Sequence, residues 1–245
     1  MTSTIDRVAV LTGGSGGIGR ASARRLAADG TAVVVHHNGN RQRAADTVAA
    51  ITDAGGRAVA VGGDIAEEGT ATALFDTAEQ EFGGVDVLVH TAGIMPLAPI
   101  AELDLEVFDR VQRVNVRGTF VVARLAARRI RPGGAIITFS TSITGLQTPG
   151  YGAYAASKGA VEAISLILAR ELRGRDVTVN AVAPGPTATP LFLEGKSPEL
   201  VEQIAGSNPF QRLGTPEDVA ETVAFLAGPG RWVNGQTIFV NGGAA

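Results

Sequence analysis

Short apolar runs alternate with longer segments whose apolar residues recur at helical spacing, almost to the end of the chain. The runs predict strands at residues 7–12, 32–36, 58–61, 85–90, 135–140, 178–182 and 237–240. The segments between them predict helices at residues 19–29, 41–54, 67–82, 105–130 and 153–173. Because such alternation is typical of βαβ units, we expect an α/β protein with a doubly wound parallel sheet.

The regular alternation stops in one place. No linker, repeat or low-complexity tract divides the chain, so residues 1–245 are predicted to form a single domain. Residues 184–215 contain five prolines and no predicted strand. A stretch of that length inside a compact domain is usually a functional lid or binding loop, although a surface excursion without a role is the alternative.

Composition excludes several classes of protein. The net charge is −3 with both signs scattered along the chain, so no nucleic-acid partner is expected. There is no cysteine, which rules out disulfides, thiolate catalysis and cysteine-ligated metal. The first residues lack the apolar core of a signal peptide, and no apolar run is long enough to cross a bilayer. We therefore expect a cytoplasmic protein without membrane association.

A glycine-rich turn follows the first predicted strand. Gly13, Ser15, Gly17, Ile18 and Gly19 lie between that strand and the next helix. Glycines in this position allow the backbone to approach a pyrophosphate, which then sits at the positive end of the helix. Any strand-to-helix turn can carry glycine, but the first βα unit of a βαβ series is where a dinucleotide site occurs. Dinucleotide binding is the prediction.

The end of the second predicted strand indicates which dinucleotide. An enzyme that selects NAD usually has a carboxylate there, which binds the ribose 2′-hydroxyl. This chain has His37, Asn38 and, a little further on, Arg41, and no carboxylate. We therefore predict a preference for NADP(H), with NAD(H) possible. The alternative is that His36 and His37 are strand-end residues without cofactor contact; they predict no metal site, because adjacent strand residues point to opposite faces.

A tyrosine and a lysine stand four residues apart at the start of the last predicted long helix. Tyr154 and Lys158 would therefore share one helix face. A free phenol has a pKa of about 10, and a nearby ammonium favours the phenolate, which brings the pKa closer to the working range. Such a pair can exchange a proton with a substrate oxygen, although a lysine on a solvated face is the alternative. Hydroxyls at residues 140–142 end the preceding strand, and ligands bind at that end of such a sheet.

Taken together, these motifs resemble the short-chain dehydrogenase/reductase family. The matching positions occur in the family's order along essentially the whole chain: Thr12, Gly13, Gly17, Gly19, Asp64, Thr91, Ala92, Gly93, Asn115, Ser142, Tyr154, Lys158, Pro184, Gly185, Thr189 and the Asn-Gly pairs at 234–235 and 241–242. The resemblance implies a seven-stranded Rossmann fold, usually assembled as a homotetramer. Within the family, the chain most resembles the branch that includes 3-oxoacyl-[acyl-carrier-protein] reductases.

The resemblance also implies roles for individual residues. Tyr154 would be the general acid–base, Lys158 would lower its pKa and bind the nicotinamide ribose, and Ser142 would hold the carbonyl oxygen. Asn115 would bend its helix and hold a water that relays protons to Lys158. The cofactor would be contacted by the turn residues named above, by His37, Asn38 and Arg41, and by Asp64, Ile65, Thr91, Ala92, Gly93, Tyr154, Lys158, Pro184, Gly185, Thr187 and Thr189.

Two departures from the family pattern stand out. Where relatives have Asn-Asn-Ala-Gly, this chain has His90 and Thr91 before the Ala-Gly pair, so a contact from an asparagine amide is in doubt. Ser142 precedes Tyr154 by 12 residues, where many relatives have 13, and Thr141 would restore that count. The Ser-x-x-Gly pattern at the strand end nevertheless favours Ser142.

The predicted function is reduction of a ketone, or oxidation of a secondary alcohol, by hydride transfer. A 3-oxoacyl thioester or another carbonyl compound is the expected small-molecule substrate, with apolar surface because residues 95–97, 148–151 and 191–193 are largely apolar. A non-catalytic nucleotide-binding regulator of the same fold is the alternative. Helix 153–173 is apolar over most of its circumference, so we expect it to bind another subunit.

Overall fold

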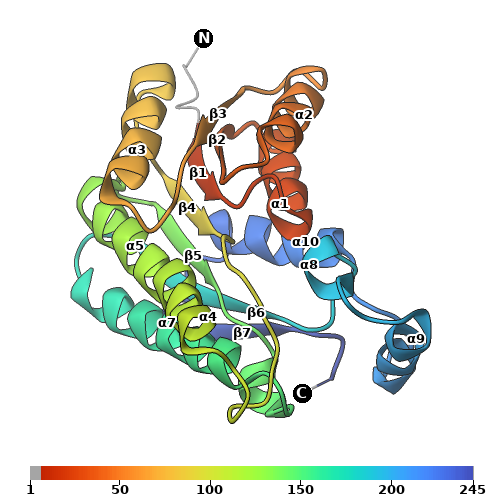
Figure 1. Cartoon of the computed structure of the whole chain (residues 1–245). Coiled ribbons are helices and arrows are strands. Elements are labelled where there is room, and N and C mark those ends of the chain that lie inside the picture. Colours follow the sequence, from red (N-terminus) through yellow and green to blue (C-terminus); the bar gives the residue numbers. More distant parts are fainter. Residues whose placement is uncertain (1–6, 245) are drawn as a thin grey trace.

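The computed structural model describes residues 7–244. Within this range, one sheet contains seven strands in the order β3-β2-β1-β4-β5-β6-β7, and every neighbouring pair is parallel. The strands are β1 Val8–Thr12, β2 Ala32–His37, β3 Ala58–Gly62, β4 Val87–His90, β5 Ala135–Phe139, β6 Thr178–Pro184 and β7 Thr237–Val240. The order reverses between β1 and β4, as Figure 1 shows. The predicted doubly wound sheet is confirmed.

Two layers of helices cover the sheet, one on each face (Figure 1). One layer contains α3 Glu68–Phe82, α5 Gly118–Arg129 and α7 Gly152–Glu171, and the other contains α1 Gly17–Ala28, α2 Arg41–Thr52 and α10 Pro216–Ala227. Strand residues alternate between them: Val8 and Val10 pack with the first layer, and Ala9 and Leu11 with the second. Burial on both faces explains why the strands are apolar throughout.

The predicted helix 105–130 contains an irregularity. It consists of α4 Leu105–Val111, a π-helical turn η1 Gln112–Arg117, and α5. The extent of the helix was predicted correctly, but the π-helical turn was not. Such turns are rare and occur frequently at functional sites, and the buried residue of η1 is Asn115.

The proline-rich segment after β6 contains two helices, α8 Pro190–Leu193 and α9 Pro198–Ser207. In each, a capping side chain, Thr189 or Ser197, precedes a proline in the first turn. Helix α10, which follows, was missed by the sequence analysis. Thr215 and Asp218 form a capping box at its start, a signature that marks a helix N-terminus in sequence.

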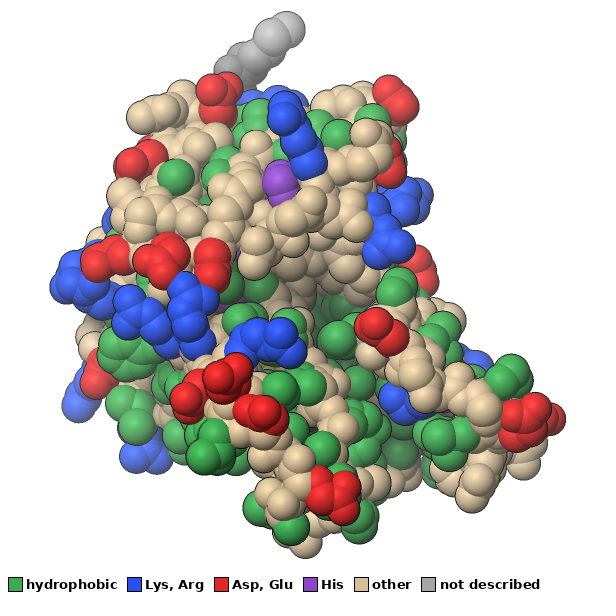
Figure 2. Space-filling view, viewed as in Figure 1, with side chains coloured by type: hydrophobic (Ala, Val, Ile, Leu, Met, Phe, Trp, Pro, Cys, Tyr) green, Lys and Arg blue, Asp and Glu red, His purple; other side chains and the backbone are tan. Residues whose placement is uncertain are grey.

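Charged side chains pair across the outer surface of the first helical layer. Figure 2 shows basic and acidic side chains interleaved over α3 and α5. Arg124 lies 2.5 Å from Glu68, and Arg129 lies 2.7 Å from both Asp76 and Glu79. Among the described residues, no helix is both long and apolar enough to cross a membrane.

Candidate active site

A pocket of about 420 Å³ opens at the carboxyl ends of the strands, where the strand order reverses. This is the place at which open α/β sheets bind ligands. Many of the predicted site residues line the pocket: Gly13, Ser15, Gly17, Ile18, Gly19, Asn38, Asp64, Ile65, Thr91, Ala92, Gly93, Ser142, Tyr154, Lys158, Pro184, Gly185, Thr187 and Thr189. The structure thus brings together segments from the first and the last third of the chain.

The turn between β1 and α1 is closely packed against its neighbours. Gly13 has a φ of +69°, and a Cβ added there would lie 2.7 Å from the Thr91 hydroxyl oxygen. A Cβ added at Gly17 would lie 2.7 Å from a methyl carbon of Thr189. The first turn of α1 has no acidic residue, and its N-cap Gly16 has no capping side chain. Backbone amides at such a helix end suit a pyrophosphate, so this cradle fits a dinucleotide.

At the end of β2 the structure differs from the expected set of contacts. His36 and Asn38 line the pocket, but His37 and Arg41 do not. The His37 ring packs over Gly62, since a Cβ added to that glycine would lie 2.8 Å from His37 Cε1. Successive strand side chains point to opposite faces, which places His36 rather than its neighbour at the pocket. Burial lowers the pKa of His36, whose Nε2 is 2.9 Å from the Gly63 carbonyl oxygen.

Asp64 lies at the wall of the pocket after β3. Its carboxylate accepts a hydrogen bond from Arg113 at 2.5 Å and another from the Ala66 amide at 2.9 Å. Partial burial alone would raise the pKa of Asp64, but these hydrogen bonds outweigh that effect and hold its pKa below the usual value. Asp64 is therefore a fixed acceptor beside Ile65.

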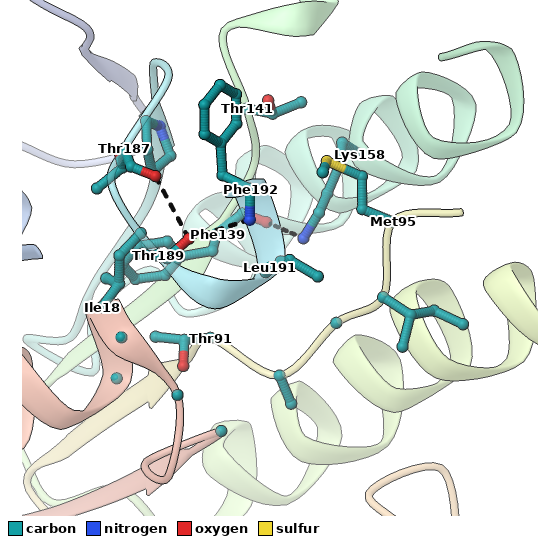
Figure 3. A pocket seen from close by; sticks show the side chains of 18 of the residues that line it. Ile18, Thr91, Met95, Phe139, Thr141, Lys158, Thr187, Thr189, Leu191 and Phe192 are labelled. Carbon is teal, nitrogen blue, oxygen red and sulfur yellow. Dashed lines mark hydrogen bonds between the residues drawn. The ribbon is translucent and has the colours of Figure 1, made fainter. Parts of the chain in front are cut away.

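Tyr154 and Lys158 lie on the first turns of α7 and are both almost completely buried. Lys158 Nζ donates a hydrogen bond to the Phe139 carbonyl at 2.7 Å (Figure 3) and is 5.7 Å from the centroid of the Tyr154 ring. Burial raises the pKa of Tyr154 to about 12, although the Thr141 side chain lowers it. Burial also lowers the pKa of Lys158 to about 8. Desolvation therefore outweighs, in this structure, the lowering of the tyrosine pKa that was expected from the lysine.

Two hydroxyls at the end of β5 lie next to this pair. The Thr141 side chain interacts with the Tyr154 phenol. Ser142 also lines the pocket, and its hydroxyl donates a hydrogen bond of 3.3 Å to the Ala183 carbonyl. The 13-residue spacing favours Thr141 for the substrate contact, whereas the Ser-x-x-Gly pattern favours Ser142. The structure gives each hydroxyl a different neighbour.

Asn115 does not line the pocket but holds its wall in place. Its side chain donates to the Ile94 carbonyl and to Ser157 Oγ, each at 3.0 Å, and accepts from the Ile94 amide at 2.9 Å. A Cβ added to Gly93 would lie 3.2 Å from Asn115 Oδ1 and 3.5 Å from Lys158 Nζ. The Asn115 and Lys158 side chains therefore both approach the backbone at Gly93.

The two residues that depart from the family pattern join β4 to β1. Thr91 Oγ1 donates to the Thr12 carbonyl at 2.7 Å, and His90 Nδ1 is hydrogen-bonded to Thr12 Oγ1 at 2.7 Å. Burial lowers the pKa of His90 to about 3, so the ring is neutral at neutral pH. Thr91 and His90 thus join the carboxyl ends of the two central strands β4 and β1, and Thr91 lines the pocket.

The outer part of the pocket is apolar. Leu191 and Phe192 come from α8, and Met95 comes from the loop after β4; Figure 3 shows all three at the pocket. Tyr151 packs edge-on against Tyr154, with ring centroids 6.5 Å apart. Ile143 was not among the predicted residues but lines the same region. A substrate in this part of the pocket would meet mainly hydrocarbon and aromatic surface.

Comparisons with known proteins agree with this geometry. A family model described as "Enoyl-(Acyl carrier protein) reductase" matches residues 13–245. A "Short-chain type dehydrogenase/reductase" of Picea abies is 47% identical over 97% of this chain and 92% of its own. An "NADPH-dependent aldehyde reductase-like protein, chloroplastic" of Arabidopsis thaliana is 46% identical over 97% and 93%. A short chain dehydrogenase from Burkholderia cenocepacia J2315 in complex with NADP has a TM-score of 0.91, 37% identity and 98% coverage of both chains.

Proposed function

Because this chain belongs to the short-chain dehydrogenase/reductase family of NAD(P)H-dependent oxidoreductases, we propose that it reduces apolar ketones or other carbonyl compounds with NADPH. The observation that carries this proposal is the burial of Tyr154 and Lys158 in the pocket that also contains the glycine turn. An acid–base pair and a dinucleotide cradle in one cavity are what reduction of a carbonyl requires.

The preference for NADPH is supported by the end of β2 and by the relatives. Asn38 lines the pocket after β2, and Gly39, Asn40 and Arg41 follow it, so no carboxylate at this turn repels a 2′-phosphate. One relative named above is described as NADPH-dependent, and one solved structure contains NADP. Asn38 would contact the adenosine end of the cofactor.

NADPH, when bound, supplies the hydride that becomes attached to the carbonyl carbon. Tyr154 would donate its phenolic proton to the carbonyl oxygen, so that the product is the alcohol. A pKa of about 12 keeps this phenol in the protonated form that the donor needs. The Lys158 ammonium would stabilise the phenolate that remains.

The hydroxyls of Thr141 and Ser142, which follow β5, would have different roles in the reaction. Thr141 interacts with the Tyr154 phenol and would orient it. Ser142 makes a long hydrogen bond of 3.3 Å to the Ala183 carbonyl, which is easily exchanged for a shorter one to a substrate oxygen. Ser142 therefore remains our assignment for the group that holds the carbonyl, and Asn115 would hold the loop after β4 in place through Ile94.

The test is turnover of NADPH with a panel of apolar ketones, aldehydes and 3-oxoacyl thioesters, followed by the Tyr154→Phe variant. Loss of the phenolic proton should lower kcat at least ~10²-fold, the usual scale for a general acid, with the NADPH Kd nearly unchanged. The only other tyrosine, Tyr151, lines the pocket, so Tyr151→Phe should change KM more than kcat. Near-wild-type turnover by Tyr154→Phe would refute the assigned role.

A further inference from the structure

Three side chains of α7 reach the same short segment at the end of β5. They stand four residues apart, at Tyr154, Lys158 and Glu162, so they follow one side of the helix. Tyr154 interacts with the Thr141 side chain, and Lys158 donates to the Phe139 carbonyl. Glu162 is the third member of this row, and neither the motifs nor the proposed function gives it a role.

Glu162 binds two hydroxyls of that segment through one oxygen. Its Oε1 accepts a short hydrogen bond from Ser140 Oγ and a second, of 3.0 Å, from Thr144 Oγ1. Ser140 is only 3% exposed. Thr144 Oγ1 also lies within donating distance of the Thr141 carbonyl, at 2.9 Å, so its single proton is shared between the two acceptors. Through these two hydrogen bonds, one acceptor oxygen of Glu162 ties both ends of residues 140–144 to α7.

The two tied hydroxyls flank the residues that face the reacting atoms. Thr141 and Ser142 lie between Ser140 and Thr144, so their positions relative to Tyr154 depend on how the segment is attached to α7. The attachment through Lys158 is a hydrogen bond from a residue whose ammonium would also serve the cofactor and the phenolate. Glu162 itself does not line the pocket, so its carboxylate is not needed for contact with a bound molecule.

We propose that Glu162 is a positioning residue for the reduction, which holds Thr141 and Ser142 in register with Tyr154 by binding the hydroxyls of Ser140 and Thr144. The proposal rests on the proposed function. It requires an acceptor oxygen at this point rather than a negative charge, because both contacts are hydrogen bonds donated by neutral hydroxyls.

The acceptor is tested by comparing Glu162→Ala with Glu162→Gln, which keeps a carbonyl oxygen at the same distance along the side chain. A small misplacement of reacting groups is costly, so Glu162→Ala should lower kcat about 10-fold or more, with the NADPH Kd within about twofold of wild type. Glu162→Gln should stay within about threefold of wild-type kcat. Glu171→Ala, which removes an exposed carboxylate from the last position of α7, is the matched control and should leave kcat unchanged.

Two further measurements keep the outcome unambiguous. Thr144→Val and Ser140→Ala each remove one donor. In the Glu162→Ala background, each of these substitutions should lower kcat much less than it does in the wild type, because residues that act through one contact are not additive. Amide hydrogen exchange of residues 140–146 should quicken in Glu162→Ala but not in Glu171→Ala, and this needs no turnover. Unchanged kcat in folded Glu162→Ala, equal losses for Ala and Gln, or full additivity would each overturn the proposal. Failure of the wild-type enzyme to reduce any carbonyl would instead count against the proposed function.

Discussion

At the scale of single residues, burial sets the acid–base properties of the site. Tyr154 and Lys158 are 8% and 5% exposed, and in each the loss of water favours the neutral form. The pKa of the phenol is therefore raised and that of the amine lowered. Because the charged form of tyrosine is the deprotonated one and that of lysine is the protonated one, the same loss of water moves the two pKa values in opposite directions. Reduction needs a protonated tyrosine and a charged lysine, and both conditions hold only below a certain pH.

We expect turnover in the reducing direction to fall as the pH rises through about 8, where Lys158 loses its proton. Its pKa is lowered by burial, so the ammonium is present below this value and absent above it, whereas Tyr154 stays protonated throughout. Without the ammonium, the phenolate formed by proton transfer is left unstabilised. Single-turnover reduction at saturating NADPH, measured from about pH 6 to about pH 10, would show the decline. A rate that stays constant to the upper limit would contradict it.

Local residue geometry could be predicted from the sequence, but the surroundings of each residue could not. That Tyr154 and Lys158 share a helix face follows from helical spacing alone. The order of their pKa values depends on burial, and burial depends on elements far away in the chain. The two histidines at the end of β2 show the same limit. His36 lines the pocket and His37 does not, because the two side chains lie on opposite faces of β2.

At the scale of elements, the strands were predicted from their continuous apolar runs. The long helices α1, α2, α3, α5 and α7 were predicted from apolar residues at helical spacing. The family resemblance implied a bend of the helix at Asn115, but the apolar pattern contains no signal for the π-helical turn η1. Asn115 hydrogen-bonds to Ile94, a contact made only in the folded protein. Helix α10 was missed although Thr215, Pro216 and Asp218 carried the signal. Helices α8 and α9 are short and lie in a proline-rich segment, where periodicity is weak.

The turn between β2 and α2 is expected to determine the choice of cofactor. Asn38→Asp places a carboxylate among the pocket residues, where it would repel the 2′-phosphate of NADPH and accept a hydrogen bond from the 2′-hydroxyl of NADH. The kcat/KM for NADPH should fall about 10-fold or more while that for NADH is kept or raised, since like charges in close contact cost several kcal/mol. Steady-state kinetics with both cofactors measures this.

The Asn38→Ala variant is the control for this substitution. It removes the amide without adding charge, so it should lower the preference for NADPH much less than Asn38→Asp does. Equal effects of the two variants would contradict electrostatic selection at this turn. A wild-type preference for NADH would contradict the assignment of the cofactor itself.

At the scale of the whole molecule, several large apolar side chains are exposed on two helices of the first helical layer. Helices α5 and α7 cover the same face of the sheet, and side chains on both point away from it: Phe120 is 58% exposed, Leu166 44% and Ile167 55%. Their exposure agrees with the sequence-based expectation that α7 is apolar on more than its sheet-facing side. Exposed apolar side chains that gather on one face mark interaction sites, and we expect Phe120, Leu166 and Ile167 to belong to one. A second copy of the chain is the partner that the family resemblance implies.

We expect Leu166→Asp to reduce the assembly to a smaller species, because a carboxylate at a buried helix contact is left without a partner. Light scattering at micromolar concentration should give a multiple of the 25.1 kDa chain mass for the wild type and a lower one for the variant. Phe225→Asp puts the same charge on α10, over the opposite face of the sheet, where Phe225 is 48% exposed. That variant should keep the contact through α5 and α7, so dimers at least should remain. A wild-type chain that is monomeric under these conditions would show that the apolar surface of α5 and α7 has a different function.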